Sequence, residues 1–307
     1  MDFETVFSDV LPIPLDEGPN PISPIAYPAE YSQAMDYFRA CARANEKSQR
    51  VLDLTAAIIE LNPAHYTVWK VRQECLIALN ADMRQELEYA TEVGLEHHKN
   101  YQVWHHREVV VTQIGYDEAV IKKELGYIHA QFKIDSKNYH AWSYRQWLVK
   151  YFNYWSEELK EVDGLIELDC RNNSAWNHRY YYFTNRPEGF SDDDLKSEIT
   201  FSLAHVRKTP NNESPWNYLR GISKKASPAS GIVDSLVNDV KNLIQENEFI
   251  VHGASFLLDI VESRIAQEAD ESKKSVDSQY AKKLCNDLMK YDIIRLKFWT
   301  YRLSLLS

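Results

Sequence analysis

Residues 99–107 read Lys-Asn-Tyr-Gln-Val-Trp-His-His-Arg, and residues 137–145 read Lys-Asn-Tyr-His-Ala-Trp-Ser-Tyr-Arg. Versions of this phrase return at steps of 34–40 residues, centred on Trp69, Trp104, Trp142, Trp176 and Trp216. A shorter version around Trp299 follows 83 residues later, about two periods, so one degenerate unit lies between. Such a period is typical of repeat arrays, in which each unit buries its apolar face only against its neighbours.

Each period divides into two helices. Val51, Leu54, Ile58 and Leu61 follow the apolar spacing of one helical face, and Asn62-Pro63 ends that helix. The same reasoning predicts helices over 47–61, 66–79, 81–97, 101–114, 117–134, 139–152, 156–168, 174–183, from 191 onward, and over 231–245, 250–267, 277–290 and 293–305. We therefore expect an all-α fold, a right-handed, crescent-shaped α-solenoid of about seven stacked helical hairpins.

The first 30 residues differ from the rest, because they hold six of the eleven prolines. Proline fixes φ and removes a backbone donor. We expect residues 1–30 to form an extended or irregular, proline-rich arm and residues 31–307 to form a single helical-repeat domain.

Composition excludes several classes of protein. The formal net charge of −10 argues against nucleic acid as the main partner, since that role needs a basic face. No apolar run reaches the roughly 18–20 residues of a membrane span, and the N-terminal residues do not resemble a secretory signal. Four scattered cysteines, Cys41, Cys75, Cys170 and Cys285, indicate reduced thiols. We expect a cytoplasmic protein.

Two polar clusters raise the question of a metal site. Ser191-Asp-Asp-Asp194 is a helix start, with a serine cap and three carboxylates at the positive end of the helix dipole. The pairs His97-His98 and His105-His106 are adjacent residues, which point in different directions on a helix. We expect no metal on this chain, and the sequence contains no complete catalytic motif.

Tryptophan and arginine are three residues apart in five of the six phrases, so they share one helical face. The simplest interpretation is packing. The indole fills the gap between hairpins, and the guanidinium stacks on it or pairs with a carboxylate of a neighbouring helix.

Positions before the tryptophan vary along the array. Three residues upstream stand Tyr66, Tyr101 and Tyr139, but then Asn173 and Glu213. Five residues upstream the second, third and fourth phrases carry a cation, the first of which is Lys99. Helix N-termini favour anions, so a lysine beside tyrosine and histidine donors suggests a contact for a phosphate-bearing ligand in the early units. The alternative is a chance match, which is common for short motifs.

The quoted phrases resemble the repeats of the protein prenyltransferase α subunit, most closely the α subunit shared by farnesyltransferase and type I geranylgeranyltransferase. Residues 99–107, 138–142, 171–180 and 212–219 carry the likeness, as do residues 16–21 and 36–39 near the N-terminus. It covers almost the whole chain.

The resemblance implies an enzyme active only as a heterodimer. In that family the α subunit wraps around an α–α barrel β subunit, which holds the catalytic zinc. Together they transfer a farnesyl or geranylgeranyl group from its diphosphate to the cysteine of a C-terminal Cys-a-a-X sequence, as in small GTPases. Zinc holds the attacking thiolate. This chain itself would bind no cofactor, and the resemblance leaves a magnesium requirement of the farnesyl reaction open.

Residue by residue, the resemblance makes Lys99 the cation beside the isoprenoid diphosphate and Gln102 the contact for the peptide carboxylate. Its catalytic positions are Lys99, Tyr101 and His140; its substrate-binding positions are Gln102, Tyr66, Asn138 and Tyr139; its supporting positions are Arg107 and Trp142.

Two other functions fit the same pattern. The α subunit of the Rab geranylgeranyltransferase shares the fold and the tryptophan repeats. A non-enzymatic scaffold resembling a tetratricopeptide array would use a similar binding column in every unit. Which β subunit accompanies the chain, and hence which isoprenoid is transferred, depends on the partner.

Overall fold

The computed structural model describes residues 1–227, 230–246 and 249–306. It divides into two compact units, Met1–Phe152 and Asn153–Ser307. All regular elements of the described residues are helices. The expectation of a single domain over 31–307 stays a prediction.

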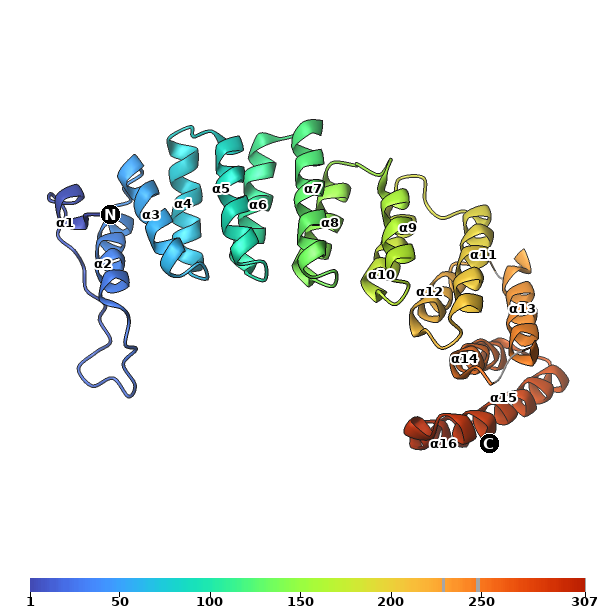
Figure 1. The fold of residues 1–307 in the computed structure, drawn as a ribbon. Coiled ribbons are helices and arrows are strands. Elements are labelled where there is room, and N and C mark those ends of the chain that lie inside the picture. Colours follow the sequence, from blue (N-terminus) through green and yellow to red (C-terminus); the bar gives the residue numbers. More distant parts are fainter. Residues whose placement is uncertain (228–229, 247–248, 307) are drawn as a thin grey trace. The chain divides into compact units, whose positions relative to one another are not determined.

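The first unit contains three stacked hairpins, α3 with α4, α5 with α6 and α7 with α8, preceded by α1 and α2. The second helices form one layer, because α4 packs on α6 and α6 on α8. The turns that begin α4, α6 and α8 lie along one edge of this unit (Figure 1). The helices are α1 (Phe3–Val6), α2 (Ala29–Arg43), α3 (Gln49–Leu61), α4 (Tyr66–Ala78), α5 (Met83–Glu96), α6 (Tyr101–Ile114), α7 (Glu118–Ile134) and α8 (Tyr139–Tyr151).

The second unit pairs α9 with α10, α11 with α12, α13 with α14 and α15 with α16, and α12 packs on both α10 and α14. From α3 onward the described residues thus form seven hairpins, which confirms the α-solenoid. The elements are α9 (Glu158–Leu168), α10 (Asn173–Asn185), α11 (Asp192–Lys208), α12 (Glu213–Ser223), α13 (Ile232–Glu246), α14 (Val251–Gln267), α15 (Glu271–Tyr291), the 3₁₀ turn η2 (Ile293–Arg295) and α16 (Leu296–Ser304).

Each repeated tryptophan except Trp299, which donates to the Asp292 side chain, closes the turn that precedes its own helix. Its indole N–H donates to the carbonyl six residues upstream, at 2.8–3.0 Å. This bond satisfies a backbone acceptor that a helix end would otherwise leave without a partner. The donor–acceptor pairs are Trp69–Pro63, Trp104–His98, Trp142–Ser136, Trp176–Cys170 and Trp216–Pro210.

Within each unit, repeated arginines link one hairpin to the next. Arg107, 1% exposed, donates to both carboxylate oxygens of Glu124 at 2.9 and 2.6 Å, and its guanidinium lies 3.6 Å from the centre of the Tyr127 ring. The Tyr144 hydroxyl donates to the same carboxylate at 2.6 Å. Of the two predicted arrangements, pairing with a carboxylate is therefore confirmed at Arg107, whose guanidinium stacks on Tyr127 and not on a tryptophan.

Equivalent buried groups recur at other junctions. Arg72 pairs with Glu86 and stacks on Tyr89, and Arg179 pairs with Glu198 and stacks on Phe201. A buried carboxylate is tolerated only when it is fully paired, so each junction needs all members of its group.

The degenerate unit between Trp216 and Trp299 is the α13–α14 hairpin. Ala254, fully buried, stands at the fourth position of α14, where α12 has Trp216. A Cβ at the adjacent Gly253 would lie 3.1 Å from the Trp216 ring. Small residues in α14 therefore make room for the indole of the preceding hairpin.

Two expectations differ from the structure. The N-terminal arm is not extended or irregular throughout: Phe3 and Phe7 are buried against Tyr37, and the Asp2 side chain caps the short helix α1. An apolar i, i+4 pair behind a capping aspartate explains this turn. Helix α15 begins at Glu271 rather than at 277, because Asp270 caps it through the Ser272 N–H.

Candidate functional site

The edge of the first unit that carries the α4, α6 and α8 N-termini displays three equivalent tyrosines. Tyr66, Tyr101 and Tyr139 are the first residues of these helices and are 71%, 68% and 70% exposed. Large aromatic side chains held in solvent at the same position of successive helices contribute little to the core. They form a row of rings and hydroxyls open to a ligand or partner.

Lys99 lies on this edge, directly before α6. Residues 96–102 and Ala64 line an open depression of about 470 Å³, which also holds Tyr101 and Gln102. Asn100 caps α6 by accepting from the Gln102 N–H at 2.8 Å. The positive end of the α6 dipole and the Lys99 ammonium both favour an anion here, while the Glu96 carboxylate opposes one.

Lys99 forms an ion pair with Asp135 of the next hairpin. Its Nζ lies 3.1 Å from Oδ2 of Asp135, with 65% of the lysine side chain and 32% of the aspartate exposed. The other oxygen of Asp135 accepts from the Lys137 N–H at 3.0 Å. That N–H, and then the Lys99 ammonium, hold the pKa of Asp135 below its ordinary value, so the carboxylate is ionised.

His140 meets Tyr101 across the junction between α8 and α6. The two ring centres are 4.2 Å apart at 85°, an edge-to-face contact. The imidazole also lies parallel to the indole of Trp104, at 6.5 Å and 15°. Burial lowers the pKa of His140, so the ring is neutral at pH 7 and can both donate and accept a hydrogen bond.

Three of the expected site residues lie inside the hairpin junctions instead of on the open edge. Asn138 is 2% exposed, and its side chain caps α8 while donating to the His98 carbonyl. Arg107 is held by Glu124, and Trp142 is 5% exposed against Phe132. All three side chains are thus buried in the packing between helices.

The adjacent residues His105 and His106 point in different directions, as expected for neighbours on a helix. His106 is fully buried, and its Nε2 lies 2.6 Å from the Glu86 carboxylate, whereas His105 is exposed beside Glu108. The part of the chain that the structure describes contains no group of three His, Cys, Asp or Glu side chains able to hold a metal ion. In the same residues no helix is both long and apolar enough to cross a membrane.

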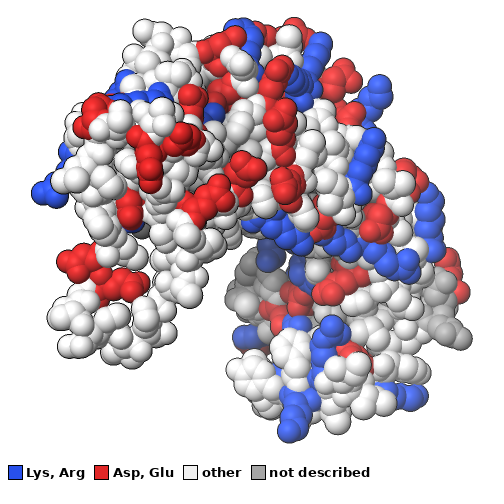
Figure 2. All heavy atoms as spheres, turned by 60° about the vertical axis from the view of Figure 1, so that its left-hand side comes forward, with Lys and Arg blue, Asp and Glu red and all other residues white. Residues whose placement is uncertain are grey.

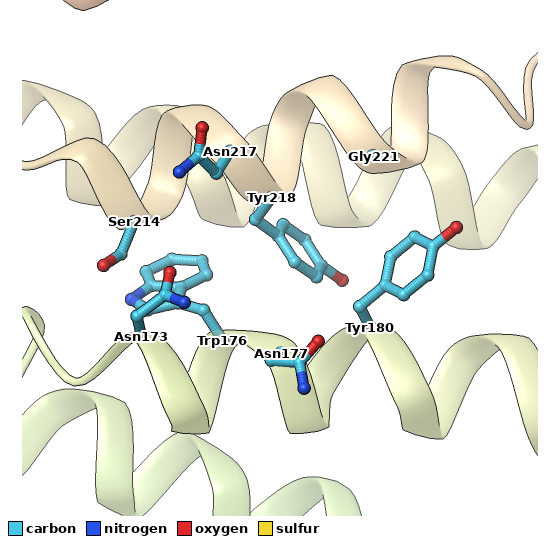
Figure 3. Close-up of a pocket in the computed structure, with 8 residues that line it drawn as sticks. All are labelled: Asn173, Trp176, Asn177, Tyr180, Ser214, Asn217, Tyr218 and Gly221. Atoms are coloured by element: carbon cyan, nitrogen blue, oxygen red, sulfur yellow. The ribbon is translucent and has the colours of Figure 1, made fainter. Parts of the chain in front are cut away.

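A second cavity lies in the other unit, between α10 and α12 (Figure 3). Its volume is about 220 Å³, and the buried indole of Trp176 and ring of Tyr218 line it together with neutral amides and hydroxyls. None of its eight lining residues is charged, so it lacks the cation that a diphosphate requires. Its residues are Asn173, Trp176, Asn177, Tyr180, Ser214, Asn217, Tyr218 and Gly221.

Charged side chains of both signs are interspersed over the face shown in Figure 2. Several form pairs between helices, such as Lys123 with Glu88 at 2.9 Å. The net charge of the chain is negative, so the chain as a whole does not attract anions. Lys99 can therefore attract an anionic ligand only at short range, within its own depression.

Comparison with known families agrees with the repeat. The family model of the protein prenyltransferase alpha subunit repeat matches residues 48–79, 83–114, 121–152, 155–186 and 195–226. These segments begin in or beside the first helix of five successive hairpins and end close to the end of the second. The chain belongs to the protein prenyltransferase α subunits.

Relatives within that family align over nearly the whole chain. A "Protein farnesyltransferase/geranylgeranyltransferase type-1 subunit alpha" of Dictyostelium discoideum is 37% identical over 98% of this chain and 92% of its own length. The protein of the same name from Solanum lycopersicum is 39% identical over 97% and 89%. A solved structure, "Candida albicans protein geranylgeranyltransferase-I complexed with GGPP", is 30% identical, covers 98% of both chains and has a TM-score of 0.82.

The Rab-type relatives are more distant. "Geranylgeranyl transferase type-2 subunit alpha" of Bos taurus is 28% identical over 62% of this chain and 36% of its own length. The chain is therefore of the type shared by farnesyltransferase and type I geranylgeranyltransferase.

Proposed function

We propose that this chain acts in protein prenylation through the edge that carries Lys99 and the N-termini of α4, α6 and α8. As an α subunit of the farnesyltransferase/geranylgeranyltransferase type I kind, it works in a heterodimer that transfers an isoprenoid from its diphosphate to a cysteine thiol of a C-terminal Cys-a-a-X sequence. We assign to this chain the contacts to the diphosphate and to the end of the peptide. The partner β subunit would hold the zinc, which when bound would activate the cysteine of the peptide as a thiolate.

The observation that carries this assignment is the grouping of Lys99, Tyr101, Gln102 and His140. These residues come from two neighbouring hairpins, yet the ion pair, the depression and the edge-to-face contact bring them to one exposed edge. Negative charge builds on the diphosphate as the bond to the isoprenoid carbon breaks. The Lys99 ammonium would neutralise that charge, which is an electrostatic form of catalysis.

The remaining polar groups of the site would hydrogen-bond or border the two substrates. The Tyr101 hydroxyl and the neutral His140 ring can donate hydrogen bonds to phosphate oxygens. The Gln102 amide, half-buried beside Lys99, would donate to the terminal carboxylate of the peptide. Tyr66 and Tyr139 would border the substrates from the adjacent helices. Asn138 would act only through the cap and the His98 bond. Whether the farnesyl reaction requires magnesium depends on the assembled site.

A scaffold function is less well supported. It would need the same binding surface in each hairpin, but the exposed tyrosine of α4, α6 and α8 is replaced by Asn173 in α10 and Glu213 in α12. The cation–tyrosine combination is therefore confined to the early hairpins, as a local site requires. We propose a cytoplasmic location, because Cys41, Cys75 and Cys285 are buried free thiols.

Reconstitution tests the proposal. The chain would be co-expressed with farnesyltransferase and type I geranylgeranyltransferase β subunits, and each complex assayed with farnesyl and geranylgeranyl diphosphate on a Cys-a-a-X peptide. Transfer by a complex, absent from either chain alone, is expected, and the productive pairing identifies the isoprenoid. A chain that binds neither β subunit would overturn the enzyme assignment, and binding without transfer would favour a scaffold.

A further inference from the structure

The Lys99 site contains a carboxylate that the proposed reaction does not use. Asp135 is the last residue before the turn into α8, and its Oδ2 lies 3.1 Å from Lys99 Nζ. A bare carboxylate beside a diphosphate is unfavourable, since like charges repel. Its presence at this position therefore needs a physical reason.

The Asp135 carboxylate is held rigidly. Its backbone N–H donates to the Gln131 carbonyl, its own carbonyl accepts from the Asn138 N–H at 3.0 Å, and Oδ1 accepts from the Lys137 N–H. Three bonds within one turn leave the carboxylate little freedom. The negative end of the α7 dipole also lies here and adds to the attraction for a cation.

Lys99, in contrast, has no second ion-pair partner among the residues that the structure describes. Its side chain is 65% exposed. A lysine side chain carries about 2 kcal/mol of rotamer entropy, which a catalytic contact must otherwise overcome. Pairing with a rigid neighbour is one way to lower that cost before substrate binds.

We propose that Asp135 is a positioning residue that holds the Lys99 ammonium in place for the diphosphate leaving group. This inference rests on the function proposed above. Two opposite effects follow. Asp135 orders Lys99 and so favours the transition state, in which charge on the leaving group is greatest, but its own charge weakens binding of the diphosphate in the ground state.

The next hairpin provides a matched control. Asp169 follows α9 as Asp135 follows α7, and its Oδ1 accepts from the Arg171 N–H at 2.9 Å in the same kind of turn. Asp135→Asn and Asp169→Asn both keep an oxygen for the turn bond and both remove one negative charge. Only Asp135→Asn removes the negative charge that is paired with the Lys99 ammonium.

The test compares heterodimers containing Asp135→Asn, Lys99→Ala, the double variant and Asp169→Asn. For Asp135→Asn we expect kcat to fall about 10-fold and the KM for isoprenoid diphosphate to fall or stay constant, on the scale of losing one orienting contact. Inorganic diphosphate should bind more tightly. In the Lys99→Ala background, Asp135→Asn should have no further effect on kcat, and Asp169→Asn should behave like the unsubstituted complex.

Equal effects of Asp135→Asn and Asp169→Asn would overturn the inference, because the cause would then be the turn. So would a kcat loss of the same size in the Lys99→Ala background, or a rise in KM. Normal turnover by Lys99→Ala would instead overturn the proposed role of Lys99 and, with it, this inference. Normal turnover by Asp135→Asn beside an impaired Lys99→Ala overturns the inference alone. Size-exclusion chromatography confirms assembly of each complex.

Discussion

Trp104 and Asn138 donate hydrogen bonds to the same backbone oxygen, the carbonyl of His98, at 3.0 and 2.9 Å. One donor belongs to the hairpin that contains His98 and the other to the next hairpin. The carbonyl thus ties successive hairpins together, immediately before Lys99. In the second unit, Trp176 and Asn212 share the Cys170 carbonyl in the same way.

Asn138 therefore has two separable structural roles. Asn138→Ala should lose the α8 cap and the bond to His98, and we expect a loss of about 2 kcal/mol in stability, about 1 kcal/mol for each. Asn138→Ser should lose about half as much, because serine can still cap the helix. Thermal unfolding of the purified chain measures both. Equal losses would show that the bond to the His98 carbonyl contributes nothing.

The buried Arg107–Glu124 pair should matter far more than an exposed one. Arg107→Ala leaves a fully buried carboxylate without its cation, and we expect about 3–5 kcal/mol of destabilisation. Arg84→Ala removes an exposed guanidinium from Asp117 and should cost at most about 1 kcal/mol. Unfolding midpoints of the two variants provide the comparison. Similar shifts would contradict the importance of the junction groups.

Two helical glycines should respond oppositely to alanine. A Cβ at Gly94 would collide with the Tyr127 hydroxyl and lie 3.1 Å from Val103, so Gly94→Ala should cost about 1–3 kcal/mol. A Cβ at Gly126 meets nothing within 4 Å, so Gly126→Ala should stabilise α7 by about 0.5–1 kcal/mol. Thermal unfolding gives the sign of each change. A stabilising Gly94→Ala would refute the close packing of α5 on α7.

Stability should also depend on pH through His106. Burial lowers the pKa of this ring from its ordinary 6.5, so the folded chain keeps it neutral while the unfolded chain takes up a proton below about pH 6.5. The unfolded state then binds more protons, and stability falls as pH falls. His106→Gln cannot titrate, so its unfolding midpoint should drop less between pH 7.5 and 5.5. An identical drop in both proteins would exclude this contribution.

Much of the fold could be predicted from the sequence, because the repeated phrase marks where helices begin. The phrase around Trp104 marks a helix start, and its period fixes the number of hairpins. Glu86, Glu124 and Glu198 could not be found in this way, because they lie in the first helices, at positions with no recurring phrase around them. Only packing shows that they meet the repeated arginines.

The sequence singled out some residues of the candidate site but not others. Lys99, Tyr101 and His140 stood out because they break the uniformity of the repeat, and the structure brings them to one edge. Asn138 belongs to the repeated cap, and its burial is a tertiary property that a motif does not reveal. Asp135 carried no signal at all, because an aspartate before a helix is an ordinary turn residue.

Lys99 itself provides the most direct measurement. We would compare Lys99→Ala with Lys123→Ala, which removes a similarly exposed lysine from an ion pair between helices. Assembled with the β subunit that supports transfer, Lys99→Ala should lower turnover by roughly 10²-fold or more, the usual scale for losing one charge-stabilising donor, while Lys123→Ala should not. Normal turnover by a correctly assembled Lys99→Ala heterodimer would contradict the assignment of this edge to the leaving diphosphate.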